Sequence, residues 1–407
     1  MIKFCKKCLY PSTHPLGLIF NKDGICSGCL VHQEKFSLDW DFRLNKLKKI
    51  VKQYSSKKNN YDCIVPVTGG TDSFFIVHIV KNILKLNPLL VHYNKYYNTN
   101  TGIENLAKLR IKFGCDMLIQ NPNMDSIKKI TKYTLYTKGN IYWHCLAGTQ
   151  AFAVQTSIKN QIPLIIWGAN QGIEQVGMFS HKDEVEMTKR YWIDHDLSNL
   201  KIEDILNDPE SEVREEDLIS FFYPEFVDLI KNGTRGIYLG NYIPWNSKKQ
   251  NELMIKKYDY KTFKNQRSFD NYQYFDCYNY LNLHDLLKFY KHGYSKITDQ
   301  VCREIRFDRI SRQMGINIIK NYEEKKIQYI DLFLKWIGLS DLDSFMDLIE
   351  SFKNERFWKK IDIKKYQKKV CSDYHNRTNI NSSIKLANNP AKSISKKKGY
   401  IYFGKGF

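Results

Sequence analysis

The stretch Thr68-Gly69-Gly70-Thr71-Asp72-Ser73 decides the fold that this sequence predicts. A short apolar run over residues 61–67 precedes it, and a helix-like apolar run over residues 74–84 follows. A strand that turns tightly into a helix leaves unpaired backbone N–H groups at the helix N-terminus, where the helix dipole also favours an anion. Glycines let the backbone approach such a ligand closely. The stretch therefore predicts a phosphate-binding loop, with an ordinary capped Gly-Gly turn as the alternative.

The side chains of this loop add to the prediction. Thr68, Thr71 and Ser73 supply hydroxyl donors. Asp72 would repel a phosphate unless a cation lay between them, so its presence indicates bound Mg²⁺. The loop is not the P-loop of the common NTPases, because no Gly-Lys-Ser/Thr follows at the required spacing.

The flanking sequence predicts an α/β fold with a parallel sheet. Short apolar runs alternate with helical patterns, as in sheets covered by helices on both faces. After about residue 180 the pattern changes to helical segments rich in Tyr and charged residues. The predicted strands are 61–67, 89–93, 116–120 and 163–168, and the predicted helices include 39–57, 74–84, 103–113, 146–159, 279–292, 299–306 and 311–339.

Four cysteines lie close together near the N-terminus. Cys5 and Cys8 form one Cys-x-x-Cys pair, and Cys26 and Cys29 form a second pair 17 residues later. Two such pairs supply four thiolates for one tetrahedral structural Zn²⁺. We therefore expect a zinc ribbon as an independent module over residues 1–35, an ATP-binding sheet domain over 36–180, a mainly helical substrate or partner region over 181–383, and a tail over 384–407.

Composition and the lack of a predicted targeting or spanning segment favour a soluble, cytoplasmic protein. Hydrophobic residues make up 43% of the 407 residues, enough for a packed core, and no targeting or membrane-spanning segment is predicted. The formal net charge is +20, which suits an anionic substrate or tRNA. Because Lys is spread along the chain, an AT-rich coding bias is the favoured explanation of this charge.

The loop resembles the Ser-Gly-Gly-x-Asp-Ser loop of the PP-loop ATP pyrophosphatases, with Thr68 in place of the usual Ser. Members of that superfamily adenylate a carbonyl oxygen and then let a nitrogen or sulfur nucleophile displace AMP. The resemblance implies an adenine nucleotide alpha hydrolase-like domain that uses ATP and Mg²⁺ and releases pyrophosphate.

Further motifs, in order along the chain, resemble the N-acetyl sugar amidotransferases. That family serves surface-glycan pathways, including O-antigen amidino sugars and the acetamidino forms of pseudaminic or legionaminic acid used on flagellin. The resemblance covers about residues 3–325 and rests on the order of weak motifs behind the ribbon. They are Asn98-Thr-x-x-Gly102-x-x-Asn105-Leu106, Ile165-Ile-Trp-Gly-Ala-Asn170, His284-Asp285, Gly293-Tyr-x-Lys296-x-Thr-Asp299, and Arg303-x-Ile-Arg306-x-x-Arg309-x-x-Arg312.

These motifs suggest site residues. Ligands of parallel sheets bind beyond the carboxyl ends of the strands, and in the PP-loop family the end of the second strand lines the adenine. We expect three arginines at three-residue spacing to share one helix face and to bind a sugar carboxylate or pyrophosphate; a solvated or salt-bridged helix face is the alternative. The expected ATP-binding residues are Thr68, Gly69, Gly70, Thr71, Asp72, Ser73, His92, Gly168 and Asn170; the expected substrate-binding residues are Glu174, Lys296, Arg303, Arg306 and Arg309; the expected catalytic residues are Asp72, Ser73 and Arg306.

The nitrogen source is expected to lie on another chain. Residue 2 is Ile, so an N-terminal Cys nucleophile is absent, and no Gly-x-Cys-x-Gly glutaminase motif occurs. The resemblance implies a separate glutaminase of the histidine-synthase type, which channels ammonia, together with an anionic sugar substrate.

Two rival functions stay open. A tRNA thiolase or lysidine-type enzyme shares the PP-loop and suits the basic charge, but no second Cys-x-x-Cys pair lies beside the sheet domain. Cys145 follows His144 near a predicted helix start, where a lowered thiol pKa would suit sulfur transfer; a packed, inert Cys145 is the favoured interpretation. A zinc-ribbon nucleic-acid binder is the third class, and the intact phosphate loop argues against it.

Overall fold

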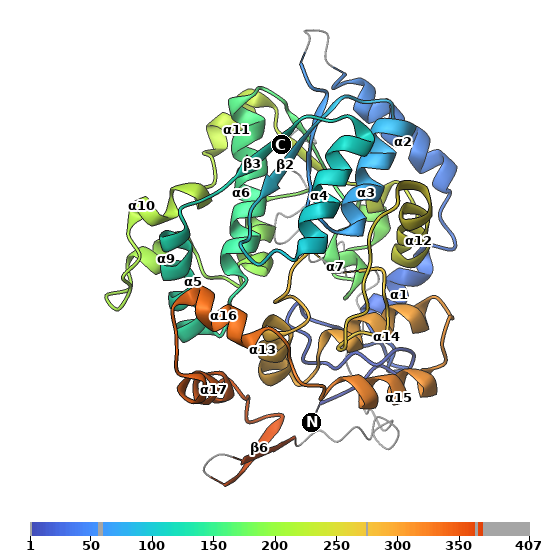
Figure 1. The fold of residues 1–407 in the computed structure, drawn as a ribbon. Coiled ribbons are helices and arrows are strands. Elements are labelled where there is room, and N and C mark those ends of the chain that lie inside the picture. The colour runs from blue at the N-terminus through green and yellow to red at the C-terminus, as the bar shows by residue number, and fades with distance from the viewer. Residues whose placement is uncertain (1, 56–59, 274–275, 363–364, 369–407) are drawn as a thin grey trace.

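A computed structural model describes residues 2–55, 60–273, 276–362 and 365–368. A five-stranded parallel sheet in the order β3-β2-β1-β4-β5 lies at its centre (Figure 1). The chain builds outward from β1 in one direction and then in the other, so the carboxyl ends of β1 and β4 flank the point where strand order reverses. Ligands bind at such a point. The strands are β1 (Cys63–Pro66), β2 (Pro88–Tyr93), β3 (Met117–Gln120), β4 (Leu164–Trp167) and β5 (Arg235–Tyr238).

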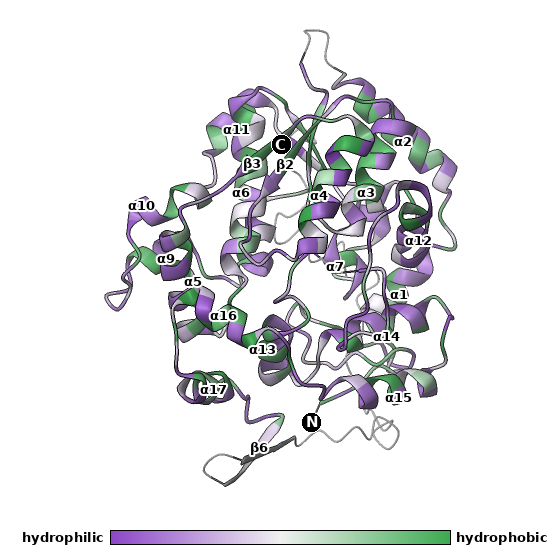
Figure 2. Cartoon of the chain, in the orientation of Figure 1, coloured by the Kyte–Doolittle hydropathy of each residue, from purple (hydrophilic) through white to green (hydrophobic). Residues whose placement is uncertain are grey.

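Alternate residues of each strand belong to different cores. Cys63 and Val65 of β1 pack on one face of the sheet, and Ile64 packs on the other. This period of two places apolar side chains on both faces, as a sheet covered on both sides requires. The apolar residues accordingly gather along the strands and the helices over them (Figure 2).

Two layers of helices cover the sheet. On one face lie α2 (Trp40–Lys52), α3 (Thr71–His78), a π-helical turn η1 (Ile79–Ile83), α4 (Asn100–Phe113) and α12 (Ser247–Tyr258). On the other lie α5 (Met124–Lys138), α6 (Trp143–Lys159) and the region of α9 (Ile202–Leu206), α10 (Glu215–Leu218) and α11 (Phe226–Asn232). The predicted parallel α/β fold class with a helical C-terminal region is confirmed.

The sheet domain extends further along the chain than the predicted limit at residue 180. β5 pairs with β4 from Leu164–Arg235 to Trp167–Tyr238, and α12 packs against α3. The sequence analysis missed β5 because its four residues include Arg235 and Gly236, which break the apolar run. Arg235 is tolerated in the buried strand because it forms an ion pair of 2.8 Å with Glu186.

The N-terminal segment is not an independent module. Its apolar residues share one core with the C-terminal helices, including Leu9 and Phe20 from the segment and Ile305 and Ile316 from the helices. The N–H of Leu9 also donates to Cys302 Sγ at 3.3 Å. The N-terminal segment contains α1 (Ser27–Glu34). The C-terminal helices are α13 (Leu283–His292), α14 (Lys296–Arg306), α15 (Arg312–Tyr322), α16 (Ile330–Ile337) and α17 (Leu342–Ser351), and a hairpin of β6 (Trp358–Asp362) and β7 (Lys365–Lys368) follows them.

The remaining short elements connect these layers. They are α7 (Gln171–Glu174), η2 (His181–Asp183), α8 (Lys189–Tyr191), η3 (Trp192–Asp196), η4 (Ile219–Phe221) and η5 (Leu239–Asn241). None of the helices within the described ranges combines the length and hydropathy needed to cross a bilayer. The predicted tail over 384–407 lies outside the described residues.

Candidate functional site

The loop after β1 has the predicted form. Residues 67–70 leave the sheet, and α3 begins at Thr71 with Gly70 as its N-cap. The N–H of Thr68 donates to Ser73 Oγ at 2.9 Å, and the N–H of Gly70 donates to Thr68 Oγ1 at 3.0 Å. The Thr68 and Ser73 hydroxyls therefore shape the loop, and the N-terminus of α3 faces the carboxyl edge of the sheet.

Two glycines let three backbone segments meet at this loop. A Cβ on Gly69 would lie 2.2 Å from the Gly102 carbonyl oxygen, and a Cβ on Gly102 would lie 2.5 Å from Asp276 Cα. No side chain fits at either position because the obstructing atoms are backbone. Gly102 of the motif at 98–106 thus serves the phosphate loop by close packing.

The described part of the segment around residues 270–277, residues 270–273 and 276–277, contacts the loop, and the sequence analysis did not anticipate it. Thr71 Oγ1 donates to the Tyr272 carbonyl at 2.7 Å, and Asn251 Nδ2 donates to the same oxygen at 3.2 Å. Asp276 forms an ion pair of 3.2 Å with Lys95. No periodic pattern marks this segment, since it is irregular; its acidic and aromatic composition is the only signal in the sequence.

Asp72 carries the clearest sign of a missing partner. Its Oδ1 is buried and has no hydrogen-bond partner among the described residues. Burial raises the pKa of Asp72 to about 6, and the nearby Asp276 and Asp270 add to the shift against the opposing charge of Arg303. A carboxylate oxygen without a partner beside other acids is suited to bind a divalent cation. The residues present therefore fit the predicted Mg²⁺.

A cavity of about 70 Å³ lies beside Asp72, and we call it the site cavity. It joins the end of β4, the N-terminal segment and α14. Of the predicted substrate-binding residues, Arg309 is absent from its lining, while the other four are present. The lining residues used below are Asp72, Glu174, Gln273, Tyr280, Lys296, Asp299, Arg303 and Arg306.

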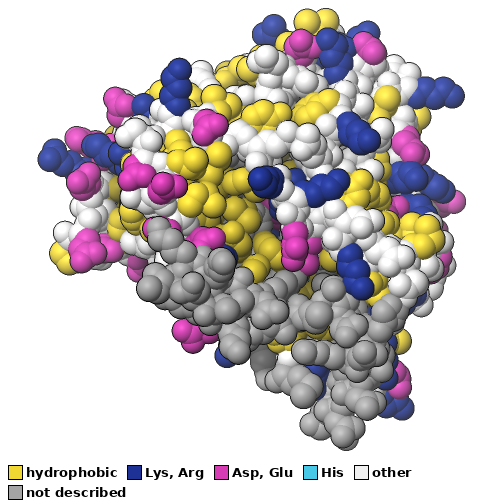
Figure 3. All heavy atoms as spheres, turned by 60° about the horizontal axis from the view of Figure 1, so that its bottom comes forward, with side chains coloured by type: hydrophobic (Ala, Val, Ile, Leu, Met, Phe, Trp, Pro, Cys, Tyr) yellow, Lys and Arg dark blue, Asp and Glu magenta, His cyan; other side chains and the backbone are white. Residues whose placement is uncertain are grey.

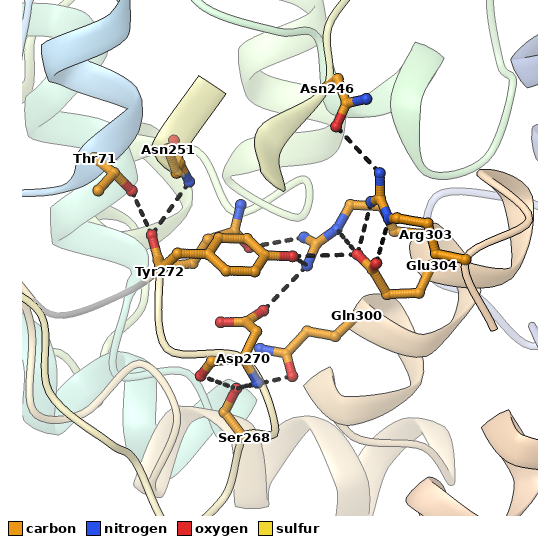
Figure 4. Close-up of polar contacts among 11 residues, drawn as sticks. Thr71, Asn246, Asn251, Ser268, Asp270, Tyr272, Gln300, Arg303 and Glu304 are labelled. Atoms are coloured by element: carbon orange, nitrogen blue, oxygen red, sulfur yellow. Dashed lines mark hydrogen bonds and ion pairs between the residues drawn. The ribbon is translucent and has the colours of Figure 1, made fainter. Parts of the chain in front are cut away.

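Arg303 is held by a network of acidic and polar side chains (Figure 4). Its Nη2 lies 3.1 Å from Asp270 Oδ2 and 3.0 Å from the Tyr272 hydroxyl, and its Nε lies 3.2 Å from Glu304 Oε1. These contacts fix the guanidinium at the wall of the cavity. None of the four partners in this network was identified from the sequence: Gln273, Asp270, Tyr272 and Glu304.

The three arginines do not share one face as predicted. α14 ends at Arg306, so Arg309 lies beyond it and pairs with Glu304. Arg306 points away from Arg303 toward the N-terminal cysteines, with Nη2 at 3.5 Å from Cys26 Sγ and Nη1 at 2.9 Å from the Glu174 carbonyl. The prediction of one arginine-lined face is wrong for Arg309, because α14 ends before this residue; Arg303 and Arg306, which lie about 60° apart around the helix, both line the site cavity.

Lys296 and Glu174 have different environments at the cavity. Lys296 Nζ lies 3.7 Å from the centroid of the Tyr280 ring, and burial lowers the pKa of this lysine. Burial would raise the pKa of Glu174, but Lys35 at 2.6 Å and His181 hold that pKa at about 2. Glu174 is therefore a charged, already paired group, whereas the Lys296 ammonium lies over the Tyr280 ring and forms no ion pair with any residue that the structure describes, although the charges of Asp299 and Asp285 act on it.

The other predicted ATP-binding residues lie at the carboxyl ends of the strands. His92 is buried at the end of β2, with Nδ1 at 2.9 Å from the Val67 carbonyl, and burial lowers the pKa of this imidazole. A Cβ on Gly168 would lie 2.9 Å from the Trp245 ring. Asn170 caps α7 by accepting a hydrogen bond from the Ile173 N–H at 3.3 Å. Their contacts in the structure are packing and capping contacts, and ATP binding by them stays a prediction.

The four N-terminal cysteines form one buried group. All four Sγ atoms lie within 4.8 Å of one another. The N–H groups of Cys8 and Cys26 point to Cys5 Sγ at 3.4 Å and 3.3 Å. Four buried sulfurs that also receive N–H groups are a donor set for one tetrahedral metal ion, and all positions are supplied by protein, which fits a structural site. The residues that would hold the ion are Cys5, Cys8, Cys26 and Cys29.

Cys145 does not have the environment of a reactive thiol. It is buried, and burial raises the pKa of its thiol. His144, at 3.4 Å, is itself buried, with its pKa lowered to about 3. The favoured expectation of a packed cysteine agrees with this environment.

A known family model matches the C-terminal part of the chain. Residues 259–370 match the family model described as LPS biosynthesis protein WbpG-like, C-terminal domain. This range contains Lys296, Arg303 and the residues 270–273 and 276–277 that contact the phosphate loop. The match shows that this C-terminal segment is similar to a domain of LPS biosynthesis proteins.

Matches to whole proteins are partial. An uncharacterized protein of Methanocaldococcus jannaschii, MJ1599, is 30% identical over 121 residues, which are 29% of this chain and 42% of that protein. The NH3-dependent NAD synthetase of Campylobacter jejuni is 15% identical, with 35% of this chain and 62% of that chain covered and a TM-score of 0.27. The U34-tRNA thiolase NcsA of Methanococcus maripaludis is 13% identical, with 84% and 91% covered and a TM-score of 0.28. The chain thus spans under two thirds of the first two relatives.

Proposed function

We propose that this protein is an ATP-dependent amidotransferase that converts an N-acetyl group of a surface-glycan sugar into an acetamidino group. The acetamido oxygen attacks the α-phosphorus of ATP, the amide proton is lost, and pyrophosphate leaves. Ammonia then attacks the carbon of the adenylated amide and AMP departs. Adenylation turns a poor leaving group into a good one.

One observation carries the proposal. Asp72, Lys296 and Arg303, from two distant parts of the chain, line one cavity beside the phosphate loop. The N-terminus of α3 is placed to hold phosphate. Bound Mg²⁺ at Asp72 would neutralise phosphate charge. The guanidinium of Arg303 and the ammonium of Lys296 supply positive charge for a carboxylate or a departing pyrophosphate.

The four-cysteine site is proposed to hold Zn²⁺ in a structural role. All four ligands come from the protein and none faces the site cavity, so a substrate has no open coordination position there. Ammonia is proposed to come from a separate glutaminase, and the protein is proposed to act in the cytoplasm.

An assay of products tests the function. Purified protein is incubated with ATP, Mg²⁺, ammonium chloride and a panel of diacetamido sugars and nonulosonic acids, free or linked to UDP or CMP. We expect AMP, pyrophosphate and a sugar about one dalton lighter, as replacing oxygen by NH requires. ADP in place of AMP would overturn the proposal.

The rival tRNA-modifying function is separated by a binding assay. On the face that Figure 3 shows, Lys and Arg side chains are scattered among acidic and apolar ones. We therefore expect weak binding of bulk tRNA at physiological salt, because a polyanion needs a gathered basic surface. Tight, salt-dependent binding together with inactivity on every sugar would favour the tRNA enzyme.

A further inference from the structure

A second cavity, of about 490 Å³, lies along α13, and we call it the α13 cavity. Its walls include Leu146 of α6, residues 194–200, and His284, Lys288 and Lys291 of α13. It is large enough for a small molecule, and no residue of the phosphate loop lines it. Neither the nucleotide nor the metal of the proposed reaction accounts for it.

One layer of side chains separates this cavity from the site cavity. His284 of the α13 cavity stacks on Tyr280 of the site cavity, with ring centroids 5.6 Å apart. Lys288 of the α13 cavity forms an ion pair with Asp299 of the site cavity. The two cavities therefore have lining residues in direct contact at two side-chain pairs.

The charges at this wall distinguish a neutral molecule from a cation. Burial lowers the pKa of the His284 imidazole well below the usual value, and the charges of Lys296, Lys291 and Lys288 lower it further. Of these lysines, Lys288 is neutralised by Asp299, while Lys291 Nζ binds the carbonyls of Lys138 and Gly139 and has no acid partner within the described part of the chain. Asp194 and Asp196 also line the α13 cavity, so the lysine charge disfavours an ammonium ion at the α13 wall rather than throughout the cavity, and it does not affect neutral ammonia.

We propose that the α13 cavity is the entrance for ammonia, which reaches the adenylated substrate by crossing the wall between His284 and the Lys288–Asp299 pair. The inference rests on the proposed function and adds to it the route of the nitrogen donor. In the step that follows, the lone pair of ammonia forms the new C–N bond, the C–O bond breaks with its electrons on AMP, and all three ammonia hydrogens stay on the resulting amidinium. His284 acts as a positioning residue of the route.

Substitutions at the mouth and at the wall test the route. Leu146 is 39% exposed at the mouth, so Leu146→Trp narrows the entrance with little risk to folding. His284→Phe keeps the stacking between Tyr142, at 4.5 Å, and Tyr280 but removes the imidazole. Ile219→Trp, at a 64% exposed position that lines neither cavity, is the matched control.

The readouts are the KM for ammonium, the KM for ATP, and sugar-dependent exchange of pyrophosphate into ATP without ammonium, measured with the sugar that the wild type accepts. We expect both route variants to raise the KM for ammonium about tenfold or more while the KM for ATP and the exchange rate stay near wild type. AMP should also form without amidated sugar, because water then competes for the adenylate. Ile219→Trp should match the wild type.

An unchanged KM for ammonium in both variants, with normal exchange, overturns the route and leaves the proposed function intact. If the wild type shows no ammonium-dependent product with any sugar, the proposed function fails and the route fails with it. Loss of exchange in His284→Phe but not in Leu146→Trp would assign His284 to the adenylation site and would also overturn its place in the route.

Discussion

At the scale of single residues, the main finding is that the chemistry depends on side chains whose partners come from far along the chain. Asp72 has one oxygen without a hydrogen bond beside Asp270 and Asp276. Arg303 is fixed by Asp270, Tyr272 and Glu304. The charged groups of the site therefore hold one another in position, and a change at one of them alters the electrostatic environment of the others.

Asp72→Asn should stabilise the metal-free protein and abolish pyrophosphate release. The pKa of Asp72 is raised in the folded state from 3.8 to about 6, so its cost to folding is absent below pH 3.8, grows as pH rises toward about 6, and is constant above that. We expect the variant to gain about 1–3 kcal/mol in free energy of unfolding at pH 8, and less at pH 5, in urea titrations without Mg²⁺.

Asp276→Asn is the matched control for Asp72→Asn. Burial would raise the pKa of Asp276, but Lys95 holds it below the usual range. Removing this charge should therefore destabilise the protein at pH 8, the opposite sign. If the gain in free energy of unfolding of Asp72→Asn over the wild type is the same at pH 5 and pH 8, the raised pKa assigned to Asp72 is contradicted.

At the scale of elements, β5 shows why a sequence pattern can conceal a strand. Its burial depends on one ion pair, in which Arg235 and Glu186 meet at 2.8 Å with side chains 10% and 0% exposed. Without Arg235, Glu186 would keep a buried charge that Arg235 no longer neutralises. Removing one partner of a buried ion pair commonly costs more folding free energy than replacing both partners.

Arg235→Met should destabilise the protein by about 3–5 kcal/mol, because Glu186 loses its partner. The double variant Arg235→Met, Glu186→Gln should recover part of this loss. Thermal unfolding of the four proteins of the cycle measures the coupling. Equal destabilisation by the single and the double variant would show that the ion pair does not hold β5 in the sheet.

At the scale of the whole molecule, the N-terminal cysteine group and the helical region unfold as one unit in our interpretation. They share a core that includes Leu9, Ile305 and Ile316, and Arg306 reaches from α14 to Cys26. The sheet has cores of its own on its two faces. A metal bound by the cysteines would therefore stabilise α14, which carries Arg303 and Lys296 to the site.

Removal of metal by a chelator should raise amide hydrogen exchange in α1, α14 and α15 several-fold while β1 and β2 keep their protection. When a structural metal leaves, the surrounding segments lose the binding free energy that stabilised their folded state, so they open more often and exchange faster. Adding Zn²⁺ back should restore protection. Exchange that rises only within residues 1–35 would contradict the shared core and support an independent ribbon.

The local features of this protein were predictable from its sequence. The strand, loop and helix around Thr68–Ser73, the four-cysteine group and most of the sheet follow from periodicity, glycines and Cys spacing, because these patterns act between residues close in the chain. The tertiary structure alone decided four placements: Arg306 at the cysteines, Tyr272 and Asp276 at the phosphate loop, β5 in the sheet, and a second cavity beside His284. Such placements depend on packing between segments up to about 300 residues apart. The local sequence pattern therefore does not predict which distant residue a long side chain will contact.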